Sequence, residues 1–384
     1  MKKFLPAAGA TTVLALATTV AHAQSSVTLY GIVDAGIAYT NNVDKGAASG
    51  SLFQATSGNI NGSRFGLRGN EDLGGGLKAV FVLENGFNIQ NGKLGQDNRL
   101  FGRRAFVGLS SNRFGTVTLG RQYDSLVDFV APLSGTAGTF GDTGFAHPFD
   151  NDNLNHSERL SNAVKFTSRN YSGFRFGALY AFANSTGFAA NRAYSAGASY
   201  SNGPLSVAAG YLQINGSNAA NTGGAVDLAE SAANGSGGFQ LGSDVQRTAG
   251  AAVSYDFGPA LASFVYTHSQ FQGTQAFGSN NGTLRFDNYE VNGKYFVTPA
   301  FTLGAAYTFT DAHVTRSTRF GASPKWNQLD LQAVYALSRR TDVYAEALYQ
   351  HASGSGYVAF INTAGGASST ANQVVGTVGV RTRF

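Results

Sequence analysis

The sequence predicts an all-β fold, a transmembrane barrel of sixteen antiparallel strands. Charged residues make up only 13% of the 384-residue chain, against roughly 25% in soluble proteins. Beyond its first 23 residues, the chain contains no run of 18 apolar residues that could cross a membrane as a helix. Apolar and polar residues alternate instead, and short and long connections follow one another in turn, which is typical of an outer-membrane-type barrel.

Residues 1–23 are predicted to be a secretory signal peptide and are excluded from the fold. Lys2 and Lys3 give a positive start, an apolar segment follows, and Ala-His-Ala at 21–23 forms a small-residue cleavage site. The alternative is an N-terminal membrane anchor. The barrel domain then covers residues 24–384.

Composition limits the classes of function. Once Lys2 and Lys3 are subtracted from the 27 Lys and Arg, 25 remain against 22 Asp and Glu, a net charge of +3. The chain shows no clustered basic run of the kind that nucleic-acid binders carry. It has no cysteine, so neither disulfide bonds nor thiolate metal sites are expected.

Period-two alternation identifies the strands. Near the start of the barrel domain, Leu29, Val33 and Ile37 share one face, while Thr28 and Asp34 share the other. Sixteen such segments are expected, which is enough for a water-filled lumen. They are residues 25–40, 60–72, 76–88, 100–111, 115–124, 157–168, 173–183, 192–202, 204–213, 246–257, 260–272, 286–297, 300–311, 326–338, 341–352 and 373–384.

The connections between these segments alternate in length. Short turns such as SNGPL and VTPA connect one strand to the next at every second connection. Long polar stretches make the connections between them. The long stretches are residues 41–58, 125–156, 214–245, 273–284, 313–325 and 353–371. Tight periplasmic turns and long outer loops would give this layout. The alternative, a large soluble β protein, would bury the aromatic residues of segments such as FRFGALYAF in a core instead of at the lipid boundaries.

Four segments resemble the trimeric general porins of Gram-negative outer membranes. They are SSVTLYGIVDAGIAY, SRFGLRGNEDLGGGLKAVFVLENGF, RRAFVGLSSNRFGTVTLGRQY and the closing VGVRTRF. The resemblance implies a barrel whose third outer loop, here residues 124–158, folds inward and narrows the pore. It also implies passive diffusion of small hydrophilic solutes and ions, a homotrimer surrounded by outer-membrane lipid and lipopolysaccharide, and neither cofactor nor enzymatic activity.

By this resemblance, Arg64, Arg103 and Arg159 match the basic cluster that faces the inward loop. Strand parity places two more cations, Arg68 and Lys165, along the pore. Acidic residues of the loop would set an electric field across the pore; these are Asp128, Asp142 and Asp150. A guanidinium group stays charged at any relevant pH and raises the local anion concentration in a narrow channel. An anion preference is therefore expected.

The last strand carries the expected outer-membrane assembly signal. Gly379 and Phe384 fit the pattern of similar proteins, although Thr382 stands where those proteins favour an aromatic residue. Arg381 and Arg383 lie on the face opposite the apolar residues of this strand.

Other functions are left as alternatives. A solute-specific channel would need a binding ladder for one sugar or anion, and a closed barrel would serve as an adhesin or scaffold. A Ca²⁺ site near His147 and His156 would use loop carboxylates, and an outer-membrane lipase would rest on His268 and Ser254 alone. No spacing typical of a zinc enzyme is present.

Overall fold

The structure is a computed structural model that describes residues 26–46, 49–138, 140–141, 144–216, 221, 223–227 and 241–384. The predicted signal peptide lies outside these residues and stays a prediction. Within the described residues, no helix is long and apolar enough to cross a membrane.

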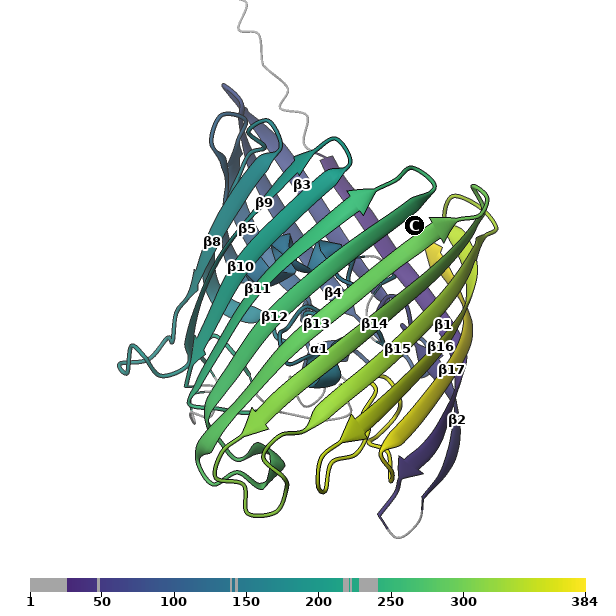
Figure 1. Cartoon of the computed structure of the whole chain (residues 1–384). Coiled ribbons are helices and arrows are strands. Elements are labelled where there is room, and N and C mark those ends of the chain that lie inside the picture. Colours follow the sequence, from purple (N-terminus) through teal and green to yellow (C-terminus); the bar gives the residue numbers. More distant parts are fainter. Residues whose placement is uncertain are drawn as a thin grey trace, which may run out of the picture.

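The described strands form one closed antiparallel sheet around a lumen (Figure 1). The strands are β1 (Ser26–Asp44), β2 (Ser49–Ser57), β3 (Arg64–Gly74), β4 (Leu77–Gly86), β5 (Arg104–Ser111), β6 (Gly115–Gln122), β7 (Leu160–Ser168), β8 (Phe174–Ala181), β9 (Arg192–Asn202), β10 (Leu205–Asn215), β11 (Val245–Asp256), β12 (Ala260–Thr274), β13 (Gly282–Phe296), β14 (Phe301–Val314), β15 (Lys325–Ala336), β16 (Thr341–Ser353) and β17 (Asn372–Arg383). Short helical segments lie in the loops: α1 (Gly95–Asn98), α2 (Ser125–Phe129), η1 (Ala131–Leu133), η2 (Pro148–Asp150) and η3 (Ala276–Gly278).

Strand β1 closes the barrel and shows why seventeen described segments make sixteen strand positions. One edge of β1 pairs with β17. Its other edge pairs first with β3 and then with β2, so β2 and β3 share a single position in the wall. The predicted sixteen-stranded antiparallel barrel is confirmed.

One predicted loop was wrong. Residues 41–58 were expected to form a long polar connection, but β1 continues to Asp44 and β2 fills most of the remainder. Between β2 and β3 the chain leaves the barrel wall, at residues 58–63. There the Asp34 carboxylate accepts hydrogen bonds from the backbone N–H groups of Ile60, at 3.0 Å, and Asn61, at 2.9 Å. These bonds replace part of the strand ladder that the break removes.

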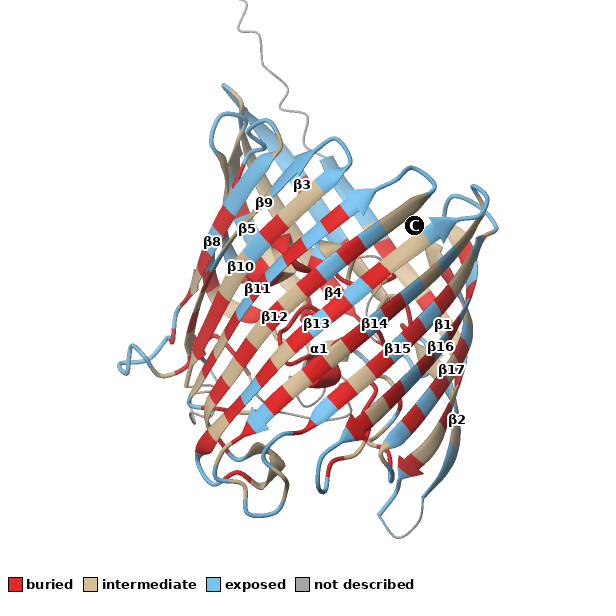
Figure 2. Ribbon diagram, viewed as in Figure 1, coloured by how far each residue is buried: buried red, intermediate tan, exposed pale blue. Residues whose placement is uncertain are grey.

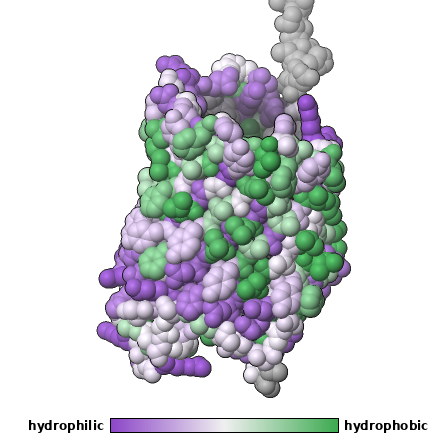
Figure 3. All heavy atoms as spheres, turned by 45° about the vertical axis from the view of Figure 1, so that its right-hand side comes forward, coloured by the Kyte–Doolittle hydropathy of each residue, from purple (hydrophilic) through white to green (hydrophobic). Residues whose placement is uncertain are grey.

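The two faces of the wall differ as a membrane barrel requires. On β13, Tyr289 and Val291 are exposed on the outside, while Asn288 and Glu290 between and beside them are buried on the inside. Figure 2 shows this alternation along most strands, and Figure 3 shows hydrophobic side chains gathered over the barrel wall. The apolar outer face therefore suits lipid, and the polar inner face suits water.

The connection between β6 and β7, residues 123–159, is called loop 3 below, and it folds into the lumen as predicted. Its helix α2 is preceded by Asp124, whose carboxylate caps the helix by accepting from the N–H groups of Leu126 at 2.6 Å and Val127 at 3.3 Å. Burial raises the pKa of Asp124 to about 6, although these hydrogen bonds lower it. Leu126 and Phe129 then pack in a buried apolar cluster with side chains of β8–β11.

Further along, loop 3 is fixed by aromatic side chains. Phe149 stacks on Phe360 with ring centroids 5.2 Å apart and meets Trp326 edge-on at 5.3 Å. Phe140 and Phe145 stack on each other at 4.8 Å and pack with buried residues of β14, β16 and β17. Loop 3 thus lies against one side of the lumen, from β8 round to β17.

Candidate functional site

Polar contacts complete the attachment of loop 3 to the inner wall. The N–H of Gly135 donates to the Glu290 carboxylate at 2.7 Å. The amide side chains of Gln328 and Gln332 donate to loop carbonyl oxygens, those of Gly144 at 3.0 Å and Phe140 at 3.1 Å. In these three contacts strand side chains meet the loop backbone, so they hold the path of the loop whatever its own side chains are.

His147 is the ionic centre of this attachment. Its Nδ1 lies 2.6 Å from Asp152 and its Nε2 lies 2.9 Å from Glu290, all three being fully or almost fully buried. Burial lowers the pKa of His147, but the two carboxylates outweigh it and raise that pKa to about 10. The imidazole is therefore protonated at neutral pH, and both ring nitrogens donate.

The opposite side of the lumen carries the arginine wall, defined as Arg64, Arg103, Arg104 and Arg159. Glu84 of β4 lies within it. Its carboxylate binds Arg103 at 2.9 Å and Arg104 at 2.6 Å and accepts from the Tyr30 hydroxyl at 2.8 Å. Two guanidinium groups thus share this carboxylate, and the arginine wall as defined holds four guanidinium groups beside the one carboxylate of Glu84.

Tyr123, the first residue of loop 3, lies among these cations. The guanidinium groups of Arg104 and Arg159 are each 5.8 Å from its ring centroid, and His156 stacks on it at 5.0 Å. Burial raises the pKa of Tyr123, but the charges of Arg103 and Arg159 lower it by a larger amount, so the pKa is lowered overall. The positive charges of the arginine wall therefore favour the ionised form of the Tyr123 hydroxyl.

Arg121 connects the backbone segments that carry Arg103 and Arg159. Its guanidinium donates to the carbonyl oxygens of Gly102 at 2.7 Å and Arg159 at 3.2 Å, and to the Ser161 hydroxyl at 2.8 Å. These contacts link the ends of β5, β6 and β7, from which Arg103 and Arg159 project.

The structure brings together the three arginines that sequence matching had selected. Arg64 and Arg103 both reach Gly62, with guanidinium nitrogens 4.0 and 3.5 Å from the position of a Cβ on that glycine. Arg68 lies four residues from Arg64 on the same face of β3, exposed, with its guanidinium 5.3 Å from the Tyr30 ring centroid.

The remaining predicted residues have varied places. Lys165 forms an ion pair with Asp128 and donates to the Tyr123 carbonyl at 2.9 Å. Asp150 is buried and accepts from the backbone N–H groups of Asn155 at 2.9 Å and Ser157 at 3.0 Å, so its carboxylate is used inside loop 3. Burial and the charge of Asp152 raise the pKa of Asp150 to about 7. Asp142 lies outside the described residues.

Sequence reasoning missed Glu84, Tyr123 and Arg104 as members of the site. Strand alternation required Arg103 and Arg104 to point in opposite directions. However, β5 begins at Arg104, so Arg103 precedes the strand and is not bound by its alternation. The Arg-Arg doublet itself was the available signal.

The loop acids considered for calcium are engaged by protein groups. Asp152 binds His147 and accepts from the Thr267 hydroxyl at 2.6 Å, and Asp128 and Asp150 have the partners given above. In the described part of the chain, no group of three or more His, Cys, Asp or Glu side chains could hold a metal ion.

A membrane barrel with an inward loop facing a basic wall defines a pore-forming protein, and comparisons with known proteins agree. The family model for Gram-negative porins matches residues 10–355. An outer membrane porin of Bordetella pertussis is 36% identical over 386 aligned residues, covering 91% of this chain and 94% of that protein. Outer membrane porin protein 32 of Delftia acidovorans is 32% identical and covers 95% of each chain.

A solved structure, the anion-selective porin from Comamonas acidovorans, matches with a TM-score of 0.73 at 26% identity. It covers 94% of this chain and 100% of the other. The chain belongs to the Gram-negative porin family. It is an outer-membrane porin, and family and fold point to a channel rather than an enzyme.

Proposed function

We propose that this porin is a passive diffusion channel for small hydrophilic solutes that prefers anions. The observation that carries the proposal is the arginine wall, where Arg103 and Arg104 share the carboxylate of Glu84 while Arg64 and Arg159 lie next to them. The similar Comamonas structure, described as anion-selective, supports the same preference. The predicted residues Arg64, Arg103 and Arg159 are assigned to the constriction, with Arg68 and Lys165 extending their field.

Electrostatics explains the preference. A cluster of like charges in a narrow channel with low-dielectric walls focuses its potential into the water path. On the opposite side, acids that would oppose this field have partners: Glu290 faces the imidazolium of His147, and Asp342 is bound by Arg381 at 3.0 Å. The ion in transit therefore experiences mainly the positive side.

The reversal potential in a planar bilayer with asymmetric KCl tests the proposal. Wild-type protein should give the anion-selective sign, and Arg64→Gln and Arg159→Gln should each move the potential toward zero. Arg113→Gln is the matched control, because Arg113 is an exposed residue of the turn between β5 and β6 and lies outside the arginine wall. A cation-selective sign in the wild type, or an equal shift in the control, would contradict the proposal.

The assembly state is part of the same proposal. A homotrimer in outer-membrane lipid and lipopolysaccharide is what the family resemblance implies, and the exposed apolar outer wall suits both lipid and neighbouring protomers. Light scattering of the detergent-solubilised protein, corrected for bound detergent, should give three chains per particle. A monomeric mass under non-denaturing conditions would contradict this part alone.

A further inference from the structure

Four glycines form a continuous row across the inner face of the wall, on four neighbouring strands. Gly177 of β8 pairs with Gly197 of β9. Gly197 pairs in turn with Gly210 of β10, and Gly210 pairs with Gly250 of β11. These four residues are called the glycine row below. A glycine inside a strand weakens it and often marks a place where another part of the backbone comes close. Four such positions side by side indicate that a segment is packed closely on them.

The segment on the glycine row is α2 of loop 3. A Cβ built on Gly197 would lie 2.8 Å from the ring of Phe129 and 3.1 Å from the carbonyl oxygen of Ser125. A Cβ built on Gly210 would lie 3.1 Å from Cδ2 of Leu126 and 3.5 Å from its Cα. Both glycines thus meet a backbone atom of α2 as well as a side chain. Rotating a side chain of α2 would therefore not make room for a larger residue in the row.

The helix is also fixed along the strands. The Oγ of Ser195, on β9, accepts a hydrogen bond from the N–H of Ser125 at 3.0 Å and donates to the Ser125 hydroxyl at 3.0 Å. Val127 and Asp128 of the same helix are only half-buried, whereas the residues that contact the row are buried. The helix therefore lies between the wall and the lumen, and its distance from the wall decides how far it projects into the lumen.

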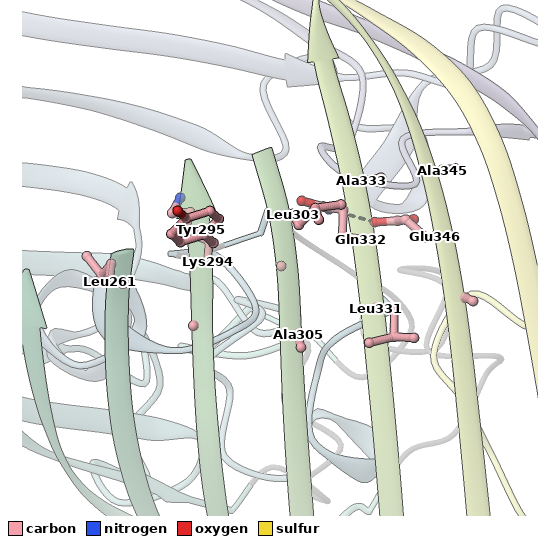
Figure 4. Close-up of a pocket in the computed structure, with 13 residues that line it drawn as sticks. Leu261, Lys294, Tyr295, Leu303, Ala305, Leu331, Gln332, Ala333, Ala345 and Glu346 are labelled. Atoms are coloured by element: carbon pink, nitrogen blue, oxygen red, sulfur yellow. Dashed lines mark hydrogen bonds between the residues drawn. The ribbon is translucent and has the colours of Figure 1, made fainter. Parts of the chain in front are cut away.

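A second part of loop 3 also rests on a glycine. The ring of Phe140 occupies the place that a Cβ on Gly304 of β14 would take. The Gln332 amide donates to the carbonyl oxygen of Phe140 at 3.1 Å and to Glu346 at 2.9 Å. Figure 4 shows the pair of Gln332 and Glu346 on the strands beside β14. Loop 3 thus approaches the bare backbone of the wall at two separate places.

We propose that the residues of the glycine row are positioning residues that set the width of the channel. Because glycine has no side chain, α2 lies as close to the wall as backbone contact allows. A larger residue in the row would displace α2 toward the centre of the lumen and narrow the water path. The size limit for solutes is thus determined in part by uncharged wall positions that the loop covers. This inference rests on the diffusion channel proposed above and is independent of its anion preference.

Single-channel conductance of the full chain in a planar bilayer tests the inference. Gly210→Val places two methyl groups against Leu126, and valine is well suited to a strand, so the barrel should still form. The conductance should fall by roughly a third, because permeation depends on the diameter of the pore. Liposome swelling should slow most for the largest sugars that the wild type admits. Gly210→Ala is the milder substitution and should lower the conductance in the same direction by a smaller amount.

The matched control is Gly376→Val on β17. A Cβ on Gly376 meets no atom of the described residues within 4 Å, so this variant adds the same side chain to a strand without pressing on loop 3. Its conductance should equal that of the wild type. Heat-modifiable migration on gels confirms that each variant is folded before it is recorded.

A volume-conserving double variant separates displacement of α2 from general damage. Gly210→Val adds three carbon atoms to the contact, and Leu126→Ala removes three, a compensation that packed cores tolerate well. Leu126→Ala alone should raise the conductance, and the double variant should return it close to the wild-type value. Wild-type conductance in Gly210→Val, an increase with added noise in that variant, or a double variant no closer to wild type would overturn the inference. A wild-type protein that does not conduct would refute the proposed function, and this inference with it.

Discussion

The two sides of the lumen carry ionisable groups in opposite situations. On the arginine wall, four guanidinium groups accompany the one carboxylate of Glu84. Arg103 and Arg159 are buried, and Arg64 and Arg104 are half-buried. On the other side, four buried acids, called the acid wall here, lie beneath or beside loop 3: Glu290, Asp330, Asp342 and Glu346. Each has its own donor. Glu290 is paired with His147, Asp330 with Gln328, Asp342 with Arg381 and Glu346 with Gln332.

The difference shows that the wall sequence alone does not set selectivity. Both sides place charged residues on inward-facing strand positions, and a bare barrel would expose them all to water. Loop 3 covers the acid wall, and its own His147 neutralises part of it. Burying charges is costly unless they are paired and hydrogen-bonded, and here the loop supplies part of the pairing. The arginines, which outnumber the carboxylate of Glu84, are therefore expected to set the sign of the field in the pore.

Breaking the centre of the arginine wall should have the largest effect. Glu84→Gln removes the carboxylate that Arg103 and Arg104 share, and Glu84 is 1% exposed. Removing one member of a buried ionic network costs about 3–5 kcal/mol. The free energy of unfolding by guanidinium in micelles, followed by the fluorescence of the single tryptophan Trp326, should fall by that amount.

The control for this prediction is Glu71→Gln, which removes an exposed carboxylate from the neighbouring strand β3. Its unfolding free energy should stay close to that of the wild type. Equal stability of the two variants would show that Glu84 does not organise the wall.

Detaching loop 3 from the other side is expected to have the next largest effect. Leu126 is 0% exposed in the apolar cluster beneath α2. Truncating a buried leucine costs about 2–5 kcal/mol. Here the lost packing energy weakens the attachment of loop 3 to the wall. Leu126→Ala should therefore increase single-channel conductance and current noise, and it should weaken anion selectivity as the acid wall is uncovered. Val127→Ala, on the partly exposed face of the same helix, is the control and should leave the conductance unchanged.

Raising the pH should loosen the same attachment through His147. Its pKa is raised from 6.5 in the unfolded chain to about 10 in the fold. The stabilisation is therefore fully present below pH 6.5 and is lost as the pH rises toward 10. Asp150 acts in the same direction at lower pH, because its pKa is raised from 3.8 to about 7 and its protonated form is favoured. Conductance and noise should grow reversibly between pH 7 and pH 10.5.

A His147→Gln variant separates this effect from general alkaline damage. It lacks the titrating imidazole, so its conductance should already be raised at pH 7 and should change little up to pH 10.5. A wild-type channel whose conductance stays flat over the same interval would contradict the ionic role of His147.

Much of the fold was readable from the sequence because strand alternation is a local property. The segment 192–202 was predicted with the bounds that β9 has, and most other strands differ by a few residues. The break at residues 58–63 was not predicted, since Asp34, which holds it, is 26 residues from Ile60 and acts through a tertiary contact. A sequence of small and polar residues around it gave no alternation to read.

The site was only partly predictable for a similar reason. Arg64, Arg103 and Arg159 could be matched by resemblance, because they belong to or adjoin strands of recognisable sequence. The pairing of His147 with Glu290 spans 143 positions and depends on where loop 3 lies. The use of Asp150 within its own loop depends on local backbone geometry, including its positive φ of 45°. Neither could follow from composition or spacing.

The smallest effect is expected from Arg68, which sharpens the comparison within the arginine side itself. Its side chain is exposed and contacts the Tyr30 ring but lies outside the network around Glu84. Arg68→Gln should therefore change the free energy of unfolding by no more than about 0.5 kcal/mol. Its effect on the reversal potential should be smaller than that of Arg159→Gln and should vanish as salt rises from 0.1 to 1 M, because the screening length then falls from about 10 to about 3 Å. A salt-independent shift as large as that of Arg159→Gln would place Arg68 within the constriction itself.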